Sequence, residues 1–255
     1  MLKTRIIPTL LYKEFGLVKG IKFNSWRRVG PVLQAIKIYN IREVDELIFL
    51  DITATNKNIE PDFDVIKEFC KFCFVPLTIG GGIKNINQVD KLLEIGADKV
   101  CVNTAAYENP NLIKEIADKY GSQCIVASID VIFEDKKWRC YSNSGAKDMN
   151  IDPISWSKHL ESIGAGEILI TSIDRDGTMK GYDQELILSV SREIKIPLIA
   201  SGGAGSFEDM HYAIAESGAS ALSASSIFHF TEKTPFEVKT FLNSKSIPVR
   251  KNFFI

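Results

Sequence analysis

Two glycine-rich segments of the chain have the composition of phosphate-binding loops. Residues 80–82 read Gly-Gly-Gly and residues 201–205 read Ser-Gly-Gly-Ala-Gly, each between a short apolar run and an amphipathic stretch. Glycine lets the backbone turn with its amides exposed, and the N-terminus of a following helix adds positive potential, so such a loop can hold a phosphate without a cationic side chain. Polar pairs that end two further apolar runs offer additional partners. We predict a phosphorylated ligand bound by Gly81, Gly82, Asn103, Thr104, Gly202, Gly203, Ser225 and Ser226.

Carboxylates that end or follow apolar runs are the candidates for proton transfer. Asp130 ends the apolar run at residues 124–130, and a carboxylate held by a rigid strand can act as a general acid or base. Asp51 and Asp174 occupy comparable places, but loop capping or pairing with a lysine is the simpler interpretation for both. We therefore expect Asp130 to take part in the chemistry.

The second half of the chain repeats the first. Pro76 and Pro197 begin equivalent segments, and other apolar runs repeat with nearly the same spacing. In one such pair Leu11 stands where the second half has Asp130. A repeat of this length is too long for a solenoid or a propeller blade and indicates a duplicated half-domain. We place the halves at about residues 1–122 and 123–255.

Short apolar runs alternate with amphipathic stretches along the whole chain. Runs that are apolar at nearly every position are typical of parallel strands buried on both faces. We predict strands at residues 6–11, 46–51, 76–80, 99–103, 124–130, 167–172, 197–201 and 221–225. We predict helices near residues 31–42, 60–73, 85–95, 109–119, 152–164, 183–194, 206–217 and 234–243, with N-caps at Asn85, Asn109, Asp152 and Ser206.

These strand–helix units predict an α/β fold, a single (β/α)8 TIM barrel over residues 1–255. An open doubly wound sheet is the alternative, but it usually carries a glycine fingerprint after its first strand, and residues 10–16 have none. The connections 12–30 and 131–150 are long and follow strand ends, where barrels place their active sites. We expect lids or substrate clamps there, with a small hairpin at residues 133–138.

Composition limits the partners. The formal net charge of −1 gives no general attraction for nucleic acid or for an anionic membrane. No apolar run approaches the roughly 18 residues of a membrane span, and the first residues do not form a signal-peptide pattern. The five cysteines and three histidines show no metal-ligand spacing, so the sequence predicts neither a metal nor a cofactor. We expect a cytoplasmic protein with free thiols.

Four charged residues stand at or just before predicted strand starts, namely Arg5, Glu46, Lys99 and Glu167. Side chains from several strands of a barrel share one interior layer, so two cations and two anions can meet in a ring at the bottom. From the residues alone, a structural salt-bridge ring is the simpler interpretation.

The chain resembles the cyclase subunit of imidazole glycerol phosphate synthase, the HisF family, nearly from end to end. Motifs of that family occur at residues 5–8, 49–54, 80–83, 96–99, 103–106, 108–110, 164–168, 171–178, 201–205 and 228–230. The resemblance implies a barrel that docks bottom-first on a HisH-type glutaminase as a heterodimer and passes ammonia to its upper face. It also implies that the four charged residues form the ammonia gate and that Asp98 contacts the glutaminase. Finally, it implies that Lys19, Asp176 and Gly177 join the glycine loops in binding the substrate.

One departure from the family bears directly on activity. The family's cyclase uses two catalytic aspartates; Asp130 matches the second, and Leu11 replaces the first. Leucine cannot exchange a proton, and general acid–base catalysis typically contributes about 10²–10⁴-fold, so ring closure should be severely weakened. The departure is similar to a paralogue branch associated with surface-polysaccharide genes. There, a barrel of this kind and its glutaminase supply ammonia to a separate amidotransferase that builds acetamidino sugars.

Three functions are compatible with the resemblance. The favoured hypothesis is an ammonia-delivering barrel subunit that serves sugar amidation. The first alternative is the histidine-pathway cyclase, which adds ammonia to a bis-phosphorylated aminoimidazole ribonucleotide precursor and closes the imidazole ring. The second is a catalytically silent scaffold that only activates and orients its glutaminase.

Overall fold

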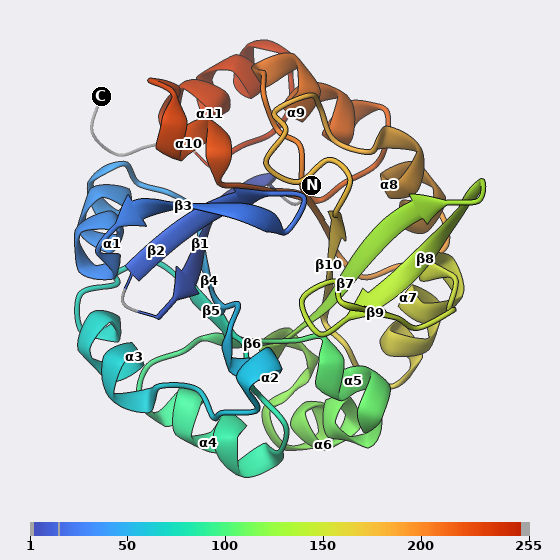
Figure 1. Cartoon of the computed structure of the whole chain (residues 1–255). Helices are drawn as coiled ribbons and strands as arrows, with labels where there is room; N and C mark the ends of the chain where they lie inside the picture. The colour runs from blue at the N-terminus through green and yellow to red at the C-terminus, as the bar shows by residue number, and fades with distance from the viewer. Residues whose placement is uncertain (1–2, 15, 251–255) are drawn as a thin grey trace.

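Parallel strands close into a ring in the computed structural model, which describes residues 3–14 and 16–250 (Figure 1). The barrel strands are β1 (Arg5–Lys13), β4 (Leu47–Asp51), β5 (Leu77–Gly80), β6 (Lys99–Val102), β7 (Ile125–Glu134), β10 (Glu167–Ser172), β11 (Leu198–Ser201) and β12 (Ala221–Ala224). Each pairs in parallel with its neighbours, and β12 returns to β1, which closes the ring. The predicted (β/α)8 TIM barrel is therefore confirmed. Residues 1–2, 15 and 251–255 of the predicted domain lie outside the described residues, and the division into two halves stays a prediction.

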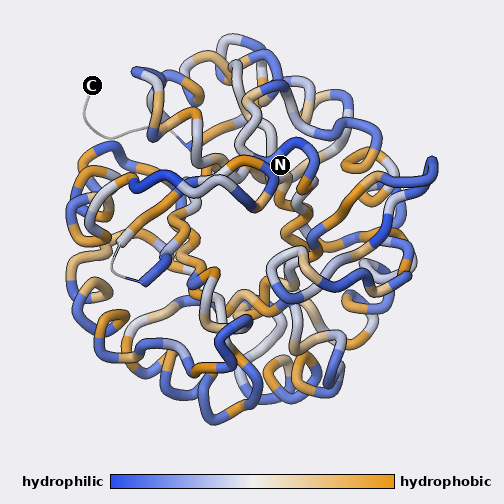
Figure 2. Tube along the Cα trace, viewed as in Figure 1, coloured by the Kyte–Doolittle hydropathy of each residue, from blue (hydrophilic) through white to orange (hydrophobic). Residues whose placement is uncertain are grey.

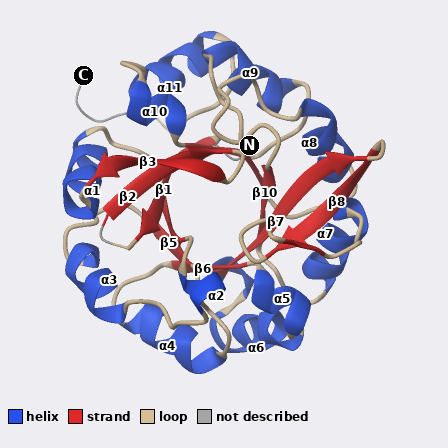
Figure 3. Ribbon diagram, viewed as in Figure 1, coloured by secondary structure: helices blue, strands red, loops and turns tan. Residues whose placement is uncertain are grey.

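Helices surround the strands on the outside of the ring (Figure 3). They are α1 (Val32–Ile41), α2 (Ala54–Lys57), α3 (Phe63–Cys70), α4 (Ile86–Glu94), α5 (Thr104–Glu108), α6 (Asn111–Tyr120), η1 (Ser122–Cys124), α7 (Pro153–Ser162), α8 (Gln184–Ser191), α9 (Phe207–Ala215), α10 (Ser226–Phe230) and α11 (Pro235–Ser244). The side chains of Asn85, Asp152 and Ser206 accept hydrogen bonds from amides three residues later, as predicted for N-caps. The prediction for Asn109 was wrong, because α6 begins at Asn111 after an uncapped Pro110.

Two apolar layers hold the barrel together. The larger layer packs the outward faces of the strands against the helices, as with Ile6, Leu47 and Leu77. A smaller layer fills the barrel interior and consists of Ile7, Ile48, Cys101, Val126, Leu169, Ile199 and Ala221, with Leu50 packed against it. Figure 2 shows hydrophobic residues along the inner ring and hydrophilic residues on the outer loops. The strands are apolar at nearly every position because both of their faces are covered.

The connection 12–30 differs from the expected loop. Strand β1 continues to Lys13, and β2 (Gly16–Ile21) and β3 (Asn24–Gly30) form an antiparallel ribbon whose β2 pairs with the end of β1. Its turn contains Lys22 and Phe23, both with positive φ, which is typical of a tight hairpin turn. The ribbon is therefore a rigid extension of the barrel sheet rather than an irregular loop.

The second long connection forms the predicted hairpin and extends it. Strand β8 (Lys137–Ser142) pairs antiparallel with the end of β7, and β9 (Lys147–Asp148) pairs with β8. The turn residues Asp135 and Lys136 have φ of 48° and 61°, which matches a two-residue hairpin turn. Both hairpins rise from the C-terminal ends of their barrel strands, so they stand at the same end of the barrel.

Candidate active site

A cavity of about 370 Å³ lies at the C-terminal ends of the barrel strands. Its walls come from the strand ends, the loops after them and the β2–β3 ribbon. Every residue predicted on the substrate side lines it, namely Leu11, Lys19, Gly81, Gly82, Asn103, Thr104, Asp130, Asp176, Gly177, Gly202, Gly203, Ser225 and Ser226. The structure thus brings together segments from both ends of the chain, while the role of each residue remains a prediction.

Asp130 is a buried carboxylate in the cavity wall. It lies on β7 opposite Thr171 of β10, and Asn103 Nδ2 donates a hydrogen bond to Asp130 Oδ2 at 2.9 Å. Burial, followed by the negative charge of Asp176, raises the pKa of Asp130 to about 7, although the hydrogen bond from Asn103 opposes the rise. A carboxyl group with this pKa exists in both protonation states near neutral pH, so it can donate or accept a proton.

Leu11 lies at the cavity end of β1. Its side chain is only 8% exposed, and in the strand register it lies opposite Leu50 of β4 and Val18 of β2. These neighbours are apolar, so the local packing suits leucine. Leucine has no titrating group, so no proton can be exchanged at this position.

Two further aspartates have the capping roles that the sequence suggested. Asp51 Oδ1 accepts hydrogen bonds from the amide and hydroxyl of Thr53 and from the amide of Ala54. Asp174 Oδ2 accepts a hydrogen bond from the amide of Phe133 and so ties the β7–β8 hairpin to its neighbouring loop. Asp51 also lines the cavity, but one of its oxygens is already engaged.

Lys19 and Asp176 form a buried ion pair. Lys19 Nζ lies 2.6 Å and 2.7 Å from the two carboxylate oxygens of Asp176, and both side chains are almost fully buried. The amide of Lys22 also donates to the carbonyl of Asp176 at 2.8 Å. The β2–β3 ribbon is thereby fixed against the loop after β10. Lys19 acts first as a tether for this ribbon, a role that the sequence did not reveal.

The two glycine loops make equivalent backbone contacts. Gly81 has φ of +106°, and a Cβ added to it would lie 2.2 Å from the carbonyl oxygen of Asp51. Gly202 has φ of +88°, and its Cβ would lie 2.6 Å from the carbonyl oxygen of Ser172. Each loop therefore packs against the end of the preceding parallel strand in the same way, and no other residue type fits without strain.

Several buried polar atoms in the cavity region have no protein partner. Among the described residues, Asn103 Oδ1, Ser225 Oγ and Ser226 Oγ are buried without a hydrogen bond. Unpaired buried polar atoms are unfavourable, and a ligand that supplies hydrogen bonds removes the penalty. All three belong to residues that were predicted to bind phosphate.

Other cavity residues were missed by the sequence analysis. Phe23 and Trp26 of the β2–β3 ribbon line the cavity, as do Asn143 and Ser144 of the other hairpin. A Cβ added to Gly145 would lie 3.1 Å from the ring of Phe23, so the two hairpins approach each other. The aromatic residues in the long connection 12–30, which follows a strand end, could have indicated that this segment contributes to the cavity.

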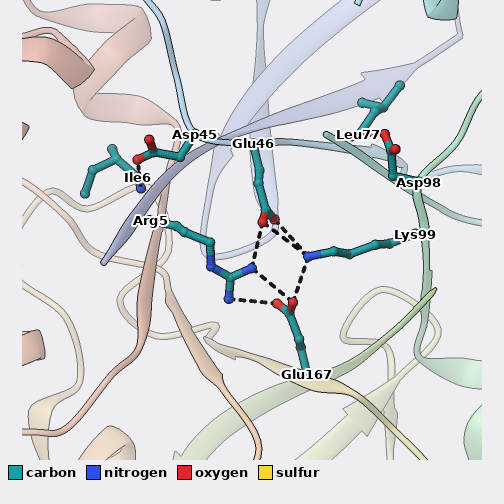
Figure 4. A network of polar contacts seen from close by, with 8 residues as sticks. All are labelled: Arg5, Ile6, Asp45, Glu46, Leu77, Asp98, Lys99 and Glu167. Carbon is teal, nitrogen blue, oxygen red and sulfur yellow. Dashed lines mark hydrogen bonds and ion pairs between the residues drawn. The ribbon is translucent and has the colours of Figure 1, made fainter. Parts of the chain in front are cut away.

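The four charged residues do meet in a ring at the opposite end of the barrel (Figure 4). Arg5 Nη1 lies 2.8 Å from Glu46 and 3.0 Å from Glu167, and Lys99 Nζ lies 3.1 Å and 2.7 Å from the same two carboxylates. Burial pushes the pKa of Glu167 upward, but hydrogen bonds and charge from Arg5 and Lys99 outweigh it, so the pKa is lowered. The pKa of Arg5 is raised by both glutamates despite its burial.

Asp98 lies beside this ring and is exposed. Its Oδ2 accepts a hydrogen bond from the amide of Leu77 at 2.8 Å, which fixes the carboxylate at the start of β5. Contact with a glutaminase stays a prediction for this residue.

The described part of the chain has neither a cluster of metal-ligating side chains nor a membrane-spanning helix. Within residues 3–14 and 16–250, no three His, Cys, Asp or Glu side chains lie close enough together to hold a metal ion. Over the same residues, no helix has the length and apolar character needed to cross a membrane.

The fold and the site together define a (β/α)8 barrel with a cavity lined by two glycine loops at one end and an ionic ring at the other. Residues 5–234 match the model of the histidine biosynthesis protein family, and the chain belongs to that family. It is 45% identical over 252 residues to the imidazole glycerol phosphate synthase subunit HisF of Endomicrobium trichonymphae, covering 98% of this chain and 96% of the relative. It is also 45% identical over 251 residues to the subunit HisF of Hydrogenobaculum sp. (strain Y04AAS1), covering 98% and 100%. Neither relative is named for sugar amidation, so these matches favour the first alternative over the hypothesis that the sequence analysis preferred.

Proposed function

We propose that this chain is the barrel subunit of an imidazole glycerol phosphate synthase of the HisF type. The observation that carries the proposal is that Asp130 and both repeat-related glycine loops line the same cavity. Two phosphate-binding loops suit a substrate with a phosphate at each end, such as the bis-phosphorylated aminoimidazole ribonucleotide precursor. The unpartnered atoms of Asn103, Ser225 and Ser226 supply hydrogen-bond capacity at both loops.

Proton transfer in the proposed reaction falls to Asp130. When ammonia adds to a carbonyl carbon, the new nitrogen has to lose protons and the oxygen has to gain them. A carboxyl group with a pKa of about 7 can perform either transfer at neutral pH. The hydrogen bond from Asn103 holds Asp130 Oδ2, which leaves Oδ1 for the substrate.

Ammonia would come from a HisH-type glutaminase bound at the ionic ring. The ring of Arg5, Glu46, Lys99 and Glu167 then acts as the gate, and Asp98 contacts the partner. The two relatives are both named as subunits, which supports a partner for this chain as well.

Leu11 favours a second candidate function. A cavity that has Asp130 but no acid at position 11 can still bind a phosphorylated ligand while the ammonia serves another enzyme. In this case the chain would deliver ammonia to a separate amidotransferase, as in acetamidino-sugar synthesis. The position of Leu11 in an apolar setting is the observation behind this candidate.

One assay distinguishes these functions. The purified chain is supplied with the ribonucleotide and an ammonium salt at alkaline pH, and loss of substrate absorbance is followed. The proposal expects slow turnover that is lost in Asp130→Asn and rises by about 100-fold or more in Leu11→Asp, since a second acid–base group is restored. Leu11→Asn is the matched control, because it has the shape of aspartate without its proton chemistry.

Other results favour the rivals. Turnover in Leu11→Asp but none in the wild type would support the second candidate. Stimulation of a glutaminase that survives Asp130→Asn, with no turnover in any variant, would support the silent scaffold. The absence of turnover in both the wild type and Leu11→Asp overturns the proposal.

A further inference from the structure

The wall of the cavity contains few positive charges. Among the described residues that line it, Lys19 and Lys84 are the only cations. Lys19 is already neutralised by Asp176, whose carboxylate oxygens lie 2.6 Å and 2.7 Å from its Nζ. The Nζ of Lys84 instead contacts a neutral oxygen, Oδ1 of Asn58, and within the described part of the chain it forms no ion pair. Lys84 is therefore the lining cation whose charge remains available to a ligand.

Lys84 follows the first glycine loop directly in the chain. Gly81, Gly82, Ile83 and Lys84 are consecutive, and all of them line the cavity. The amide of Lys84 donates to Oε1 of Gln88 at 2.7 Å, and Gln88 is a buried residue in the first turn of α4. The backbone that carries Lys84 is therefore fixed beside the loop.

The side chain of Lys84 reaches toward the segment after β4. Its hydrogen-bond partner Asn58 follows α2 directly, has φ of 56° and also lines the cavity. Helix α2 lies against the same glycine loop, because a Cβ added to Gly82 would lie 2.8 Å from the Cβ of Ala54, the first residue of α2. The ammonium group of Lys84 is thus held by the part of the wall that surrounds the first loop.

Carboxylates of the cavity wall gather on this side. Asp51 packs against the loop, since a Cβ added to Gly81 would lie 2.9 Å from the Cβ of Asp51. Glu108 ends α5, the helix after β6, and Asp130 lies on β7, which pairs with β6. Negative charges repel a phosphate dianion, and the repulsion grows where the cavity excludes water. A phosphate at the first loop therefore needs a compensating cation, and Lys84 supplies it.

The second glycine loop has a different charge environment. The nearby carboxylate is Asp176, whose amide would lie 3.5 Å from a Cβ added to Gly202, and this carboxylate is already paired with Lys19. The buried hydroxyl oxygens of Ser225 and Ser226 have no hydrogen-bond partner among the described residues. A phosphate at this loop meets neutral donors and little uncompensated negative charge. The two loops are thus alike in backbone geometry but differ in what their surroundings offer an anion.

We infer that Lys84 anchors the phosphate group held by the first glycine loop, with its Nζ donating a charge-assisted hydrogen bond to a phosphate oxygen. Such a bond is roughly twice as strong as a neutral one. An ammonium group has three donors, so the contact with Asn58 can persist when phosphate binds. The inference rests on the proposed function for the phosphorylated ligand, and it adds the residue that sets the affinity at one end of that ligand. The first phosphate is then bound through charge and the second through neutral donors.

Binding of inorganic phosphate to the purified chain tests the inference. Equilibrium dialysis at alkaline pH, where phosphate is a dianion, gives the number of sites and the affinity of each for the wild type, Lys84→Met and Lys84→Arg. Lys180→Met is the matched control, because Lys180 is an exposed lysine in the loop after β10 that does not line the cavity. We expect Lys84→Met to weaken one of two sites by about 10-fold or more, Lys84→Arg to retain most of the affinity, and the control to change it by less than about 2-fold.

Ionic strength and a second substitution identify the affected site. Added salt should weaken the first site more than the second in the wild type, and this difference should disappear in Lys84→Met, because salt screens the attraction between charges. Ser226→Ala should weaken the other site, and in the double variant both losses should be present together, since the two residues act on separate phosphates. Lys84 is exposed, so its replacement should leave the fold intact, which circular dichroism verifies.

The outcomes separate this inference from the proposed function. Two sites of unchanged affinity in Lys84→Met overturn the inference, and so does an equal loss in Lys180→Met, which would reflect general charge rather than a contact. A loss confined to the site that Ser226→Ala weakens also overturns it. If the wild type binds no phosphate, the inference fails together with the proposed bis-phosphorylated substrate. Phosphate binding that depends on Lys84, without turnover of the ribonucleotide, would support the inference and refute the proposed reaction.

Discussion

Replacement of Asp130 by asparagine should stabilise the protein at alkaline pH, although it removes the group assigned to proton transfer. Burial is the main cause that raises the pKa of Asp130 from 3.8 to about 7. Because the folded state binds this proton more tightly than the unfolded state, stability falls as the pH rises from about 4 to about 7. Above that window the charged carboxylate destabilises the fold by up to about 4 kcal/mol, at about 1.4 kcal/mol for each pKa unit. Asparagine carries no charge and can still accept the hydrogen bond from Asn103.

Urea unfolding of both proteins at about pH 5 and about pH 8.5 measures the effect. Part of the destabilisation is already present at about pH 5, so the stability difference between variant and wild type should grow by about 2–3 kcal/mol between the two conditions. The other titrating groups are common to both proteins and cancel in this comparison. A difference that is the same at both pH values would refute the reasoning, because Asp130 would then titrate like an exposed aspartate. The claim that Asp130 can act as both acid and base at neutral pH would then be wrong as well.

Three further substitutions test other parts of the structure. Lys19→Met should destabilise the fold by about 3–5 kcal/mol in urea unfolding, since it leaves the buried carboxylate of Asp176 unpaired. Adding Asp176→Asn to this variant should recover most of the lost stability. If the two substitutions have additive effects on stability, the pairing is contradicted. Gly81→Ala should lower the unfolding free energy by more than about 2 kcal/mol, because the Cβ of the alanine meets the carbonyl of Asp51. The same variant should bind phosphate more weakly in equilibrium dialysis. Unchanged stability would show that the loop can shift. Arg5→Met removes contacts that lower the pKa of Glu167, a group whose stabilising effect is lost as the pH falls below about 4.5. The acid-side loss of stability should therefore be smaller in this variant than in the wild type, and an equal loss would exclude that coupling.

The barrel could be predicted because its strands have a recognisable sequence pattern. A strand covered on both faces is apolar at nearly every position, and the duplicated pattern gave the number of strand–helix units. The segment 12–30 was harder, because a ribbon that stands above the barrel has one open face and carries charged residues such as Arg27 and Arg28. Its strand character depends on pairing with the end of β1, which no local pattern reveals.

The candidate site was predictable where backbone geometry restricts the residue type. Gly81 and Gly202 are required by close packing against neighbouring strand ends, so their positions are visible in the sequence. The ion pair between Lys19 and Asp176 joins residues far apart in the chain. Nothing in the sequence around either residue indicates that the other is its partner. The raised pKa of Asp130 likewise depends on burial and on a neighbouring charge, which only the folded chain brings together.

The apolar layer inside the barrel has a consequence for whatever travels along its axis. Side chains such as Ile7, Ile48 and Ile199 offer no hydrogen bonds, so an ion in that layer would lose its hydration without replacement. An ammonium ion would therefore be excluded more strongly than uncharged ammonia. Nitrogen that took this route would reach the far end as ammonia, with its lone pair free, so one deprotonation would be complete before any carboxylate is needed.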